Sequence, residues 1–158
     1  MQGWRITKQK YSDTAFNGEG ASLKGGRWNS QDVQMVYTSS TLSLATLEIL
    51  ARYGRRSSFL KNYVAISFNF DKELFLELEK KDLPNDWKSN PPSTSTQLIG
   101  DYWTKQQTSV ILGVPSSTVP VENNFLINPA HPDFKKIEIL KPEQINFDSR
   151  LFSCSGLT

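Results

Sequence analysis

The chain has 158 residues, a hydrophobic content of 37% and a formal net charge of +2, which together describe one ordinary folded domain. So small a net charge gives no indication of nucleic-acid binding, and no apolar run approaches the roughly 20 residues that cross a membrane. With one histidine, one cysteine and no apolar signal segment at the start, we expect no zinc-type metal site, no internal disulfide and a cytoplasmic location.

A basic turn and a strand follow one another early in the chain. Gly25 and Gly26 permit backbone shapes that other residues resist, so Arg27 lies just past a turn that can press against an anionic ligand. The residues after the turn alternate in polarity, which predicts a short strand from Val33 to about Tyr37.

A helix is predicted to follow this strand. Ser39 or Ser40 can cap its start, Tyr53 is expected near its end, and Gly54 suits the left-handed residue that closes a helix. Its apolar residues are distributed all round the axis, which predicts a largely buried helix.

Glu48 is the exception within this apolar helix, and two interpretations are open. The carboxylate can pair on the surface with Arg52, a contact worth about 0.3 to 0.5 kcal/mol. Alternatively, it leaves an apolar surface and needs a partner or a water-filled cleft. The cluster of Arg52, Arg55 and Arg56 suits the dipole at the end of the helix, with phosphate contact as the other reading.

The rest of the chain alternates between strand and helix patterns, so we expect an α+β fold in which central strands are flanked by helices. The pattern predicts a strand over Tyr63–Phe70, a short amphipathic helix over Glu73–Lys81, a loop over Leu83–Ser95, a helix over Gln97–Gln107 and a strand over Ser109–Val114. We expect the second long helix to bury Leu98, Ile99, Tyr102 and Trp103.

A second candidate site follows the last of these strands. Ser116 and Ser117 come just past its end, where a hydroxyl either projects into a cleft or forms an ordinary turn. Asn128 and His131 occupy typical turn positions further along. Because no histidine or second acidic residue accompanies the serines in a nucleophile motif, a serine hydrolase is not expected.

Two long segments, GEGASLKGGRWNSQDVQMVYTSSTLSLATLEIL and VPSSTVPVENNFLINPAHPDF, resemble the RES domain toxins of bacterial toxin–antitoxin pairs. The resemblance begins at Trp4, includes GDYW and ends at FDSRLF, which implies one RES domain over residues 1–152. Residues 153–158 are expected to be a loose tail or a remnant of cloning. The family is named for Arg, Glu and Ser positions, which its motifs place at Arg27, Glu48 and Ser116.

The resemblance implies a fold similar to that of the ADP-ribosyltransferases and a type II toxin that consumes NAD as a substrate, with no cofactor. Such an enzyme splits nicotinamide from ADP-ribose and passes the ADP-ribose to water or phosphate. The alternatives are a transferase that modifies a specific protein and a binding module without catalysis. The implied partner is an Xre-type helix-turn-helix antitoxin that covers the active site and binds the DNA, with a toxin homodimer inside a larger complex.

The implied chemistry fits Glu48. Cleavage of the bond between nicotinamide and ribose develops positive charge on the sugar, which a nearby carboxylate stabilises. Because the pyridinium ring leaves as neutral nicotinamide, no acid is needed to protonate it, and one carboxylate suffices.

The resemblance also implies how NAD is held. Arg5 and Arg27 would bind the pyrophosphate, assisted by Lys24, because a guanidinium offers paired donors to phosphate oxygens. Tyr37 would stack on the nicotinamide ring or direct its hydroxyl at the ribose. The expected catalytic set is Glu48, Arg27, Tyr37 and Ser116, and the expected NAD contacts are Arg5, Lys24, Arg27, Tyr37, Ser116 and Asn128.

Overall fold

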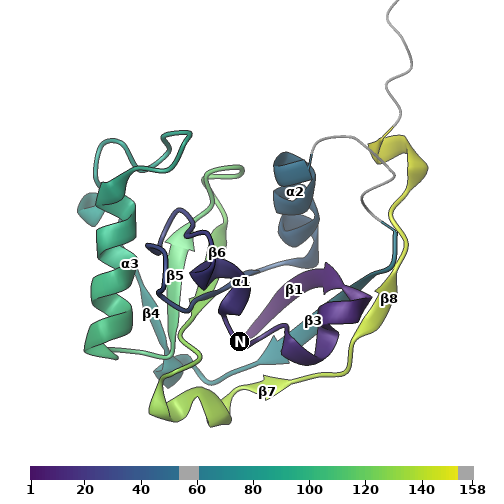
Figure 1. Cartoon of the computed structure of the whole chain (residues 1–158), viewed down its shortest axis with the longest axis horizontal. Coiled ribbons are helices and arrows are strands. Elements are labelled where there is room, and N and C mark those ends of the chain that lie inside the picture. The colour runs from purple at the N-terminus through teal and green to yellow at the C-terminus, as the bar shows by residue number, and fades with distance from the viewer. Residues whose placement is uncertain (54–60, 153–158) are drawn as a thin grey trace, which may run out of the picture.

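The structure, a computed structural model, describes residues 1–53 and 61–152, and these form one mixed sheet with helices around it (Figure 1). The strands are β1 (Gln2–Lys8), β2 (Val36–Ser39), β3 (Tyr63–Asn69), β4 (Phe75–Glu77), β5 (Ile111–Pro115), β6 (Asn123–Ile127), β7 (Glu138–Ile139) and β8 (Glu143–Ile145). The α-helices are α1 (Glu19–Ser22), α2 (Leu42–Tyr53) and α3 (Thr94–Gln106). Short 3-10 helices span Gln9–Thr14, Lys72–Leu74, Lys80–Asp82, Pro132–Lys136 and Ser149–Leu151. The expected α+β class is therefore confirmed.

The described strands are ordered β4-β5-β6-β2-β1-β3-β7, with β8 also paired to β3. The β4–β5 pair is parallel and the others are antiparallel. β1 pairs with β3 over seven residues, whereas β1 meets β2 only at Trp4 and Ser39. Beyond that single pair, the carbonyl of Tyr37 accepts a hydrogen bond from the Arg5 guanidinium. The centre of the sheet is thus held by a side chain as well as by its backbone ladder.

Two apolar clusters pack on opposite faces of the sheet, because successive strand residues point in opposite directions. Val36, Ile111 and Ile127 belong to the larger cluster with the phenylalanines of β3 and β6. Leu112 and Leu126, each next to one of these residues, belong to the smaller cluster with Trp28 and Trp103. The predicted strand over Tyr63–Phe70 is confirmed as β3, and side chains on both of its faces are buried.

The helix after β2 differs from the prediction at its start and in its burial. Ser39 lies in the strand, and the side-chain hydroxyl of Thr41 caps α2 by accepting from the backbone N–H of Leu44 at 3.0 Å. The described part of α2 extends to Tyr53, and the residues predicted to follow its end, Gly54, Arg55 and Arg56, lie outside the described residues.

The prediction that this helix is buried all round is wrong. Only Leu44 and Ala45 are buried, and Leu47 is 43% exposed. The helix packs one side against β1 and β2 (Figure 1), so apolar residues on its other side face solvent.

The predicted helix over Glu73–Lys81 is also wrong. The segment forms β4 between two 3-10 helices, and β4 adds a parallel strand beside β5. Phe75 packs on the core with ring contacts to Phe70 and Phe125. This tertiary packing outweighs the local helical pattern.

The predicted loop over Leu83–Ser95 is confirmed for most of its length, but α3 begins earlier than expected. Of the residues predicted to be buried on this helix, Trp103 is buried and Ile99 packs against the smaller cluster, whereas the other two are exposed. Thr96, Gly100 and Trp103 are buried, whereas Leu98 and Tyr102 are 61% and 66% exposed. Gly100 lies directly against the backbone carbonyl of Trp28, where a Cβ atom would clash. The close approach of Gly100 to the turn, together with the packing of Ile99 and Trp103, sets the orientation of α3. No helix in the described parts of the chain combines the length and apolar character of a membrane span.

Candidate functional site

Glu48 accepts hydrogen bonds from three neutral side chains. Its Oε1 accepts from the Ser116 hydroxyl and the Asn124 amide, both at 2.7 Å, and its Oε2 accepts from the Thr118 hydroxyl at 3.1 Å. The donors come from the turn after β5 and from β6, so the carboxylate of α2 is tied to the sheet. We call these four residues the carboxylate cluster. Among the described residues, Glu48 has no ion pair with Arg52, which excludes the surface-pair interpretation.

Ser116 is fully buried, and its hydroxyl makes every bond that it can make. It donates to Glu48 and accepts from the backbone N–H groups of Thr118 and Val119 at 3.0 and 2.9 Å. Ser116 was expected to contact the ligand, and here it instead closes the turn and orients the carboxylate. The preference for Ser116 over Ser117 agrees with this geometry.

Sequence reasoning missed Ser39, Thr118 and Asn124. The Ser39 hydroxyl donates to the Asn124 Oδ1 at 2.8 Å, and the two residues are paired across β2 and β6. Two adjacent asparagines, Asn123 and Asn124, were the sequence feature that could have indicated Asn124, because a side-chain amide inside a sheet needs hydrogen-bond partners.

Tyr37 lies on the same face of β2 as Ser39, two residues along the strand. Its hydroxyl donates to the Asn29 Oδ1 at 2.7 Å and accepts from the Trp28 N–H at 2.9 Å. Burial raises the pKa of Tyr37 above its ordinary value, so the group stays protonated. The Tyr37 hydroxyl is therefore engaged by Asn29 and Trp28, so a ligand could contact Tyr37 through its ring.

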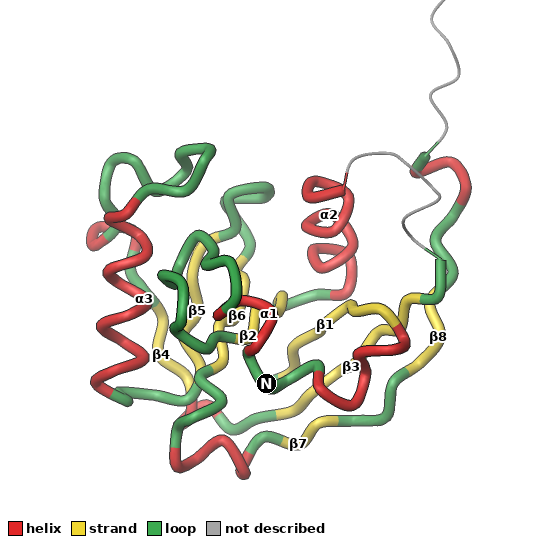
Figure 2. Tube along the Cα trace, viewed as in Figure 1, coloured by secondary structure: helices red, strands yellow, loops and turns green. Residues whose placement is uncertain are grey.

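The turn before β2 is shaped around this hydroxyl. A Cβ atom on Gly26 would lie 2.5 Å from the Tyr37 oxygen, and Gly25 has a positive φ of 69°. The segment from Leu23 to Met35 has no helix or strand (Figure 2), so these bonds hold it in place. We call Gly26, Trp28, Asn29 and Tyr37 the turn cluster.

Arg27 projects from this turn toward the loop that precedes α3. Its Nη1 donates to the carbonyls of Trp87 and Ser89 at 2.7 and 2.9 Å. Its other guanidinium nitrogens make no such bonds to residues that the structure describes, so Arg27 fixes this loop and has further donors for an anion.

Arg5 is a cation that forms no ion pair within the described parts of the chain. Its Nη1 donates to the Tyr37 carbonyl at 2.6 Å, and its buried Nε has no partner among the described residues. Burial, together with the smaller effect of the Arg52 charge, lowers the pKa of Arg5 to about 10. No described carboxylate lies within 4 Å of Arg5, Arg27 or Arg52. Within residues 1–53 and 61–152, the positive charge beside Tyr37 is thus not matched by an ion pair.

Two expected contact residues do not join this group. Lys24 is exposed, and no hydrogen bond or ion pair ties it to the site in the described structure. Asn128 is fully buried beyond the far end of β6, where its amide donates to the Thr104 carbonyl and accepts from the Ala130 N–H. Asn128 has a structural role, because both ends of its amide are taken by backbone.

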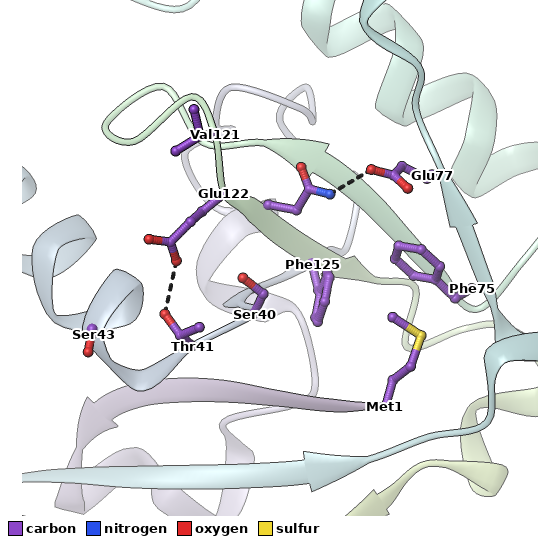
Figure 3. Close-up of a pocket in the computed structure, with 10 residues that line it drawn as sticks. Met1, Ser40, Thr41, Ser43, Phe75, Glu77, Val121, Glu122 and Phe125 are labelled. Carbon is purple, nitrogen blue, oxygen red and sulfur yellow. Dashed lines mark hydrogen bonds between the residues drawn. The ribbon is translucent and has the colours of Figure 1, made fainter.

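A surface hollow of about 560 Å³ lies behind the carboxylate cluster, between the start of α2, β4 and the start of β6 (Figure 3). Glu122 in its wall accepts from Thr41, and Glu77 accepts from Asn123, the neighbour of Asn124 (Figure 3). Asn123 and Phe125 face this hollow while Asn124, between them, faces Glu48. The hollow is therefore separate from the carboxylate cluster. No group of three or more potential metal ligands occurs in the described residues.

The fold and this arrangement define a class: a small α+β protein in which three neutral side chains fix one carboxylate on α2, and in which no described carboxylate pairs with Arg5 or Arg27. The RES domain family matches residues 2–148, and the chain belongs to this family.

Curated relatives match along almost their whole length. "Toxin Res" of Photorhabdus laumondii is 38% identical over 149 residues, covering 94% of this chain and 95% of the relative. "Toxin Res" of Yersinia enterocolitica is 35% identical, with 96% and 99% covered. "Prs ADP-ribosylating toxin" of a Sphingobium species is 34% identical, with 94% of each chain covered.

The fold also has a counterpart among solved structures. The crystal structure of the M. tuberculosis MbcT–MbcA toxin–antitoxin complex contains a chain that matches with a TM-score of 0.74, covering 96% of this chain and 86% of that one. At 16% identity, this match establishes the likeness of fold.

Proposed function

We propose that the protein is the toxin of a type II toxin–antitoxin pair and that it consumes NAD by cleaving the bond between nicotinamide and ribose. The observation that carries this proposal is the Glu48 carboxylate, which three neutral donors hold in place without neutralising it. Membership in the RES family and relatives named as toxins support the toxin role.

Glu48 would stabilise the transition state. As the bond to nicotinamide breaks, positive charge develops on the ribose, and a fixed negative charge interacts with it more strongly than with the ground state. Oε2 suits this contact, because it accepts one hydrogen bond from an exposed residue whereas Oε1 accepts two. Nicotinamide leaves as a neutral molecule, so one carboxylate is enough. The ADP-ribose then passes to water or phosphate.

The arginines would bind the rest of the dinucleotide. Arg5 and Arg27 have guanidinium nitrogens without partners among the described residues, and a pyrophosphate would supply the negative charge that pairs with them. Tyr37 would offer its ring to the nicotinamide, because its hydroxyl is held by Asn29 and Trp28. NAD is a substrate in this scheme, and no cofactor is required.

The alternative is transfer of ADP-ribose to a specific protein. The observation that favours it is the 34% identity to a relative named as a Prs ADP-ribosylating toxin. The same carboxylate would serve, since only the acceptor differs between the two reactions.

The proposed partner is an Xre-type helix-turn-helix antitoxin that covers the active site and supplies the DNA binding. Support comes from the fold match to a toxin chain solved within a toxin–antitoxin complex. We expect a toxin homodimer inside the larger assembly.

One experiment tests substrate and acceptor together. Purified protein is incubated with NAD in buffers with and without phosphate, and in parallel with a cell extract, and the products are identified by chromatography and mass spectrometry. The expected result is free nicotinamide with ADP-ribose or a phosphorylated ADP-ribose. A mass increase confined to one protein of the extract, without bulk NAD loss, would favour the transferase, and unchanged NAD without such a mass increase would contradict catalysis on NAD.

A further inference from the structure

Asn124 links Glu48 to the sheet through two successive hydrogen bonds, in which Ser39 donates to Asn124 and Asn124 donates to Glu48. The Ser39 hydroxyl donates to the Asn124 Oδ1 at 2.8 Å, and the Asn124 Nδ2 donates to the Glu48 Oε1 at 2.7 Å. The bond from Ser39 selects one orientation of the amide, in which the nitrogen faces the carboxylate.

We propose that Asn124, oriented by Ser39, is the positioning residue of Glu48, an inference that rests on the proposed function. Ser116 and Asn124 anchor Oε1 from two sides, which leaves Oε2 directed at the ribose. The backbone register pairs Ser39 with Asn124, so both side chains stand on a rigid part of the sheet.

An amide suits this position better than a charged group. A neutral donor orients the carboxylate without cancelling the negative charge that the transition state needs. A lysine or arginine there would neutralise Glu48, and a carboxylate would repel it.

The neighbouring residue provides a matched control. Asn123 donates to the Glu77 Oε1 at 2.8 Å on the opposite face of β6, a bond marked by the dashed line to Glu77 in Figure 3. Asn123→Ala therefore removes the same kind of hydrogen bond from the same strand without touching Glu48.

The first test compares kcat and KM for NAD in Asn124→Ala, Ser39→Ala and Asn123→Ala. For Asn124→Ala we expect kcat to fall about 10- to 100-fold, the loss of one hydrogen bond to a charged group, with KM within about twofold. Ser39→Ala should show a smaller fall, because the amide keeps its place but loses its fixed orientation. Asn123→Ala should match the parental protein.

The second test uses Asn124→Asp, which keeps the shape of the side chain and separates positioning from folding. An ionised carboxyl group there repels Glu48, whereas a protonated one donates to it as the amide does. The nearby charged groups, Glu122 bonded to Thr41 and Arg52 one turn along α2, are the same in both proteins. The ratio of variant to parental kcat should therefore rise as the pH falls. A merely structural role would give a ratio that is independent of pH.

The outcomes separate this inference from the proposed function. If Glu48→Gln is inactive while Asn124→Ala keeps the parental kcat, the positioning role is overturned and the proposed function stands. If the parental protein leaves NAD unchanged, the proposed function fails. In that case, the side-chain amide proton resonances of Asn124 are compared between the parental protein and Glu48→Gln. Unchanged resonances would overturn the bond to Glu48, and shifted ones would support it.

Discussion

The carboxylate cluster and the turn cluster hold functional side chains by different means. Glu48 is held by three side chains from distant elements, and all three donate to a charged group. Tyr37 is held by a backbone N–H and an amide, both neutral, from a turn less than ten residues away. Under the proposed function, the first cluster would fix a charge for chemistry, whereas the second would fix a surface for binding. Substitutions in the first should lower kcat, and those in the second should affect KM or stability.

Glu48→Gln should have the largest effect. The amide keeps the size of the side chain but removes the negative charge, so kcat for NAD should fall on the order of 10³-fold. Steady-state kinetics measure the fall in kcat, and a thermal melt checks that the variant is folded. Parental turnover in a folded variant would remove Glu48 from the mechanism.

Ser116→Ala should come next, because it removes a donor to Glu48 and the acceptor for two backbone N–H groups. We expect kcat to fall about 10- to 100-fold and the free energy of unfolding to fall by about 1 to 3 kcal/mol. Ser117→Ala is the matched control, and equal effects of the two changes would contradict the assignment to Ser116.

Arg27→Ala should act on substrate capture. A lost charge-assisted contact to phosphate costs about 1.5 to 3 kcal/mol, so KM should rise about 10- to 100-fold while kcat changes little. Lys24→Ala, at an exposed position in the same turn, serves as the comparison and should leave KM nearly unchanged. A fall in kcat with a parental KM would count against phosphate binding by Arg27.

Tyr37→Phe should have the smallest effect on turnover. It keeps the ring but leaves the Trp28 N–H and the Asn29 Oδ1 without their partner, which should cost about 1 to 3 kcal/mol of stability. Chemical denaturation measures this loss, and kcat should stay within about threefold of the parental value. A collapse of kcat at unchanged stability would mean that the hydroxyl contacts the ribose, and would erase the contrast between the two clusters.

The sequence was sufficient for features that depend on neighbouring residues. Two glycines before Arg27 predicted the tight turn, the alternation in residues 63–70 predicted β3, and helical spacing placed Glu48 on a helix. These patterns are local, because backbone conformation and periodicity depend on residues a few positions apart.

Only the tertiary structure decided what surrounds each of these residues. The donors to Glu48 lie 68, 70 and 76 residues away along the chain, so no local pattern predicts that Ser116, Thr118 and Asn124 meet there. Asn124 and Asn128 lie near opposite ends of β6. The side-chain amide of Asn128 bonds to backbone groups, whereas that of Asn124 donates to the Glu48 carboxylate. The local pattern of residues 73–81 predicts a helix, but in the folded protein part of this segment pairs with β5 as the strand β4. Hydrogen-bond partners and sheet edges are supplied by distant segments, and their identity is fixed only when the chain is folded.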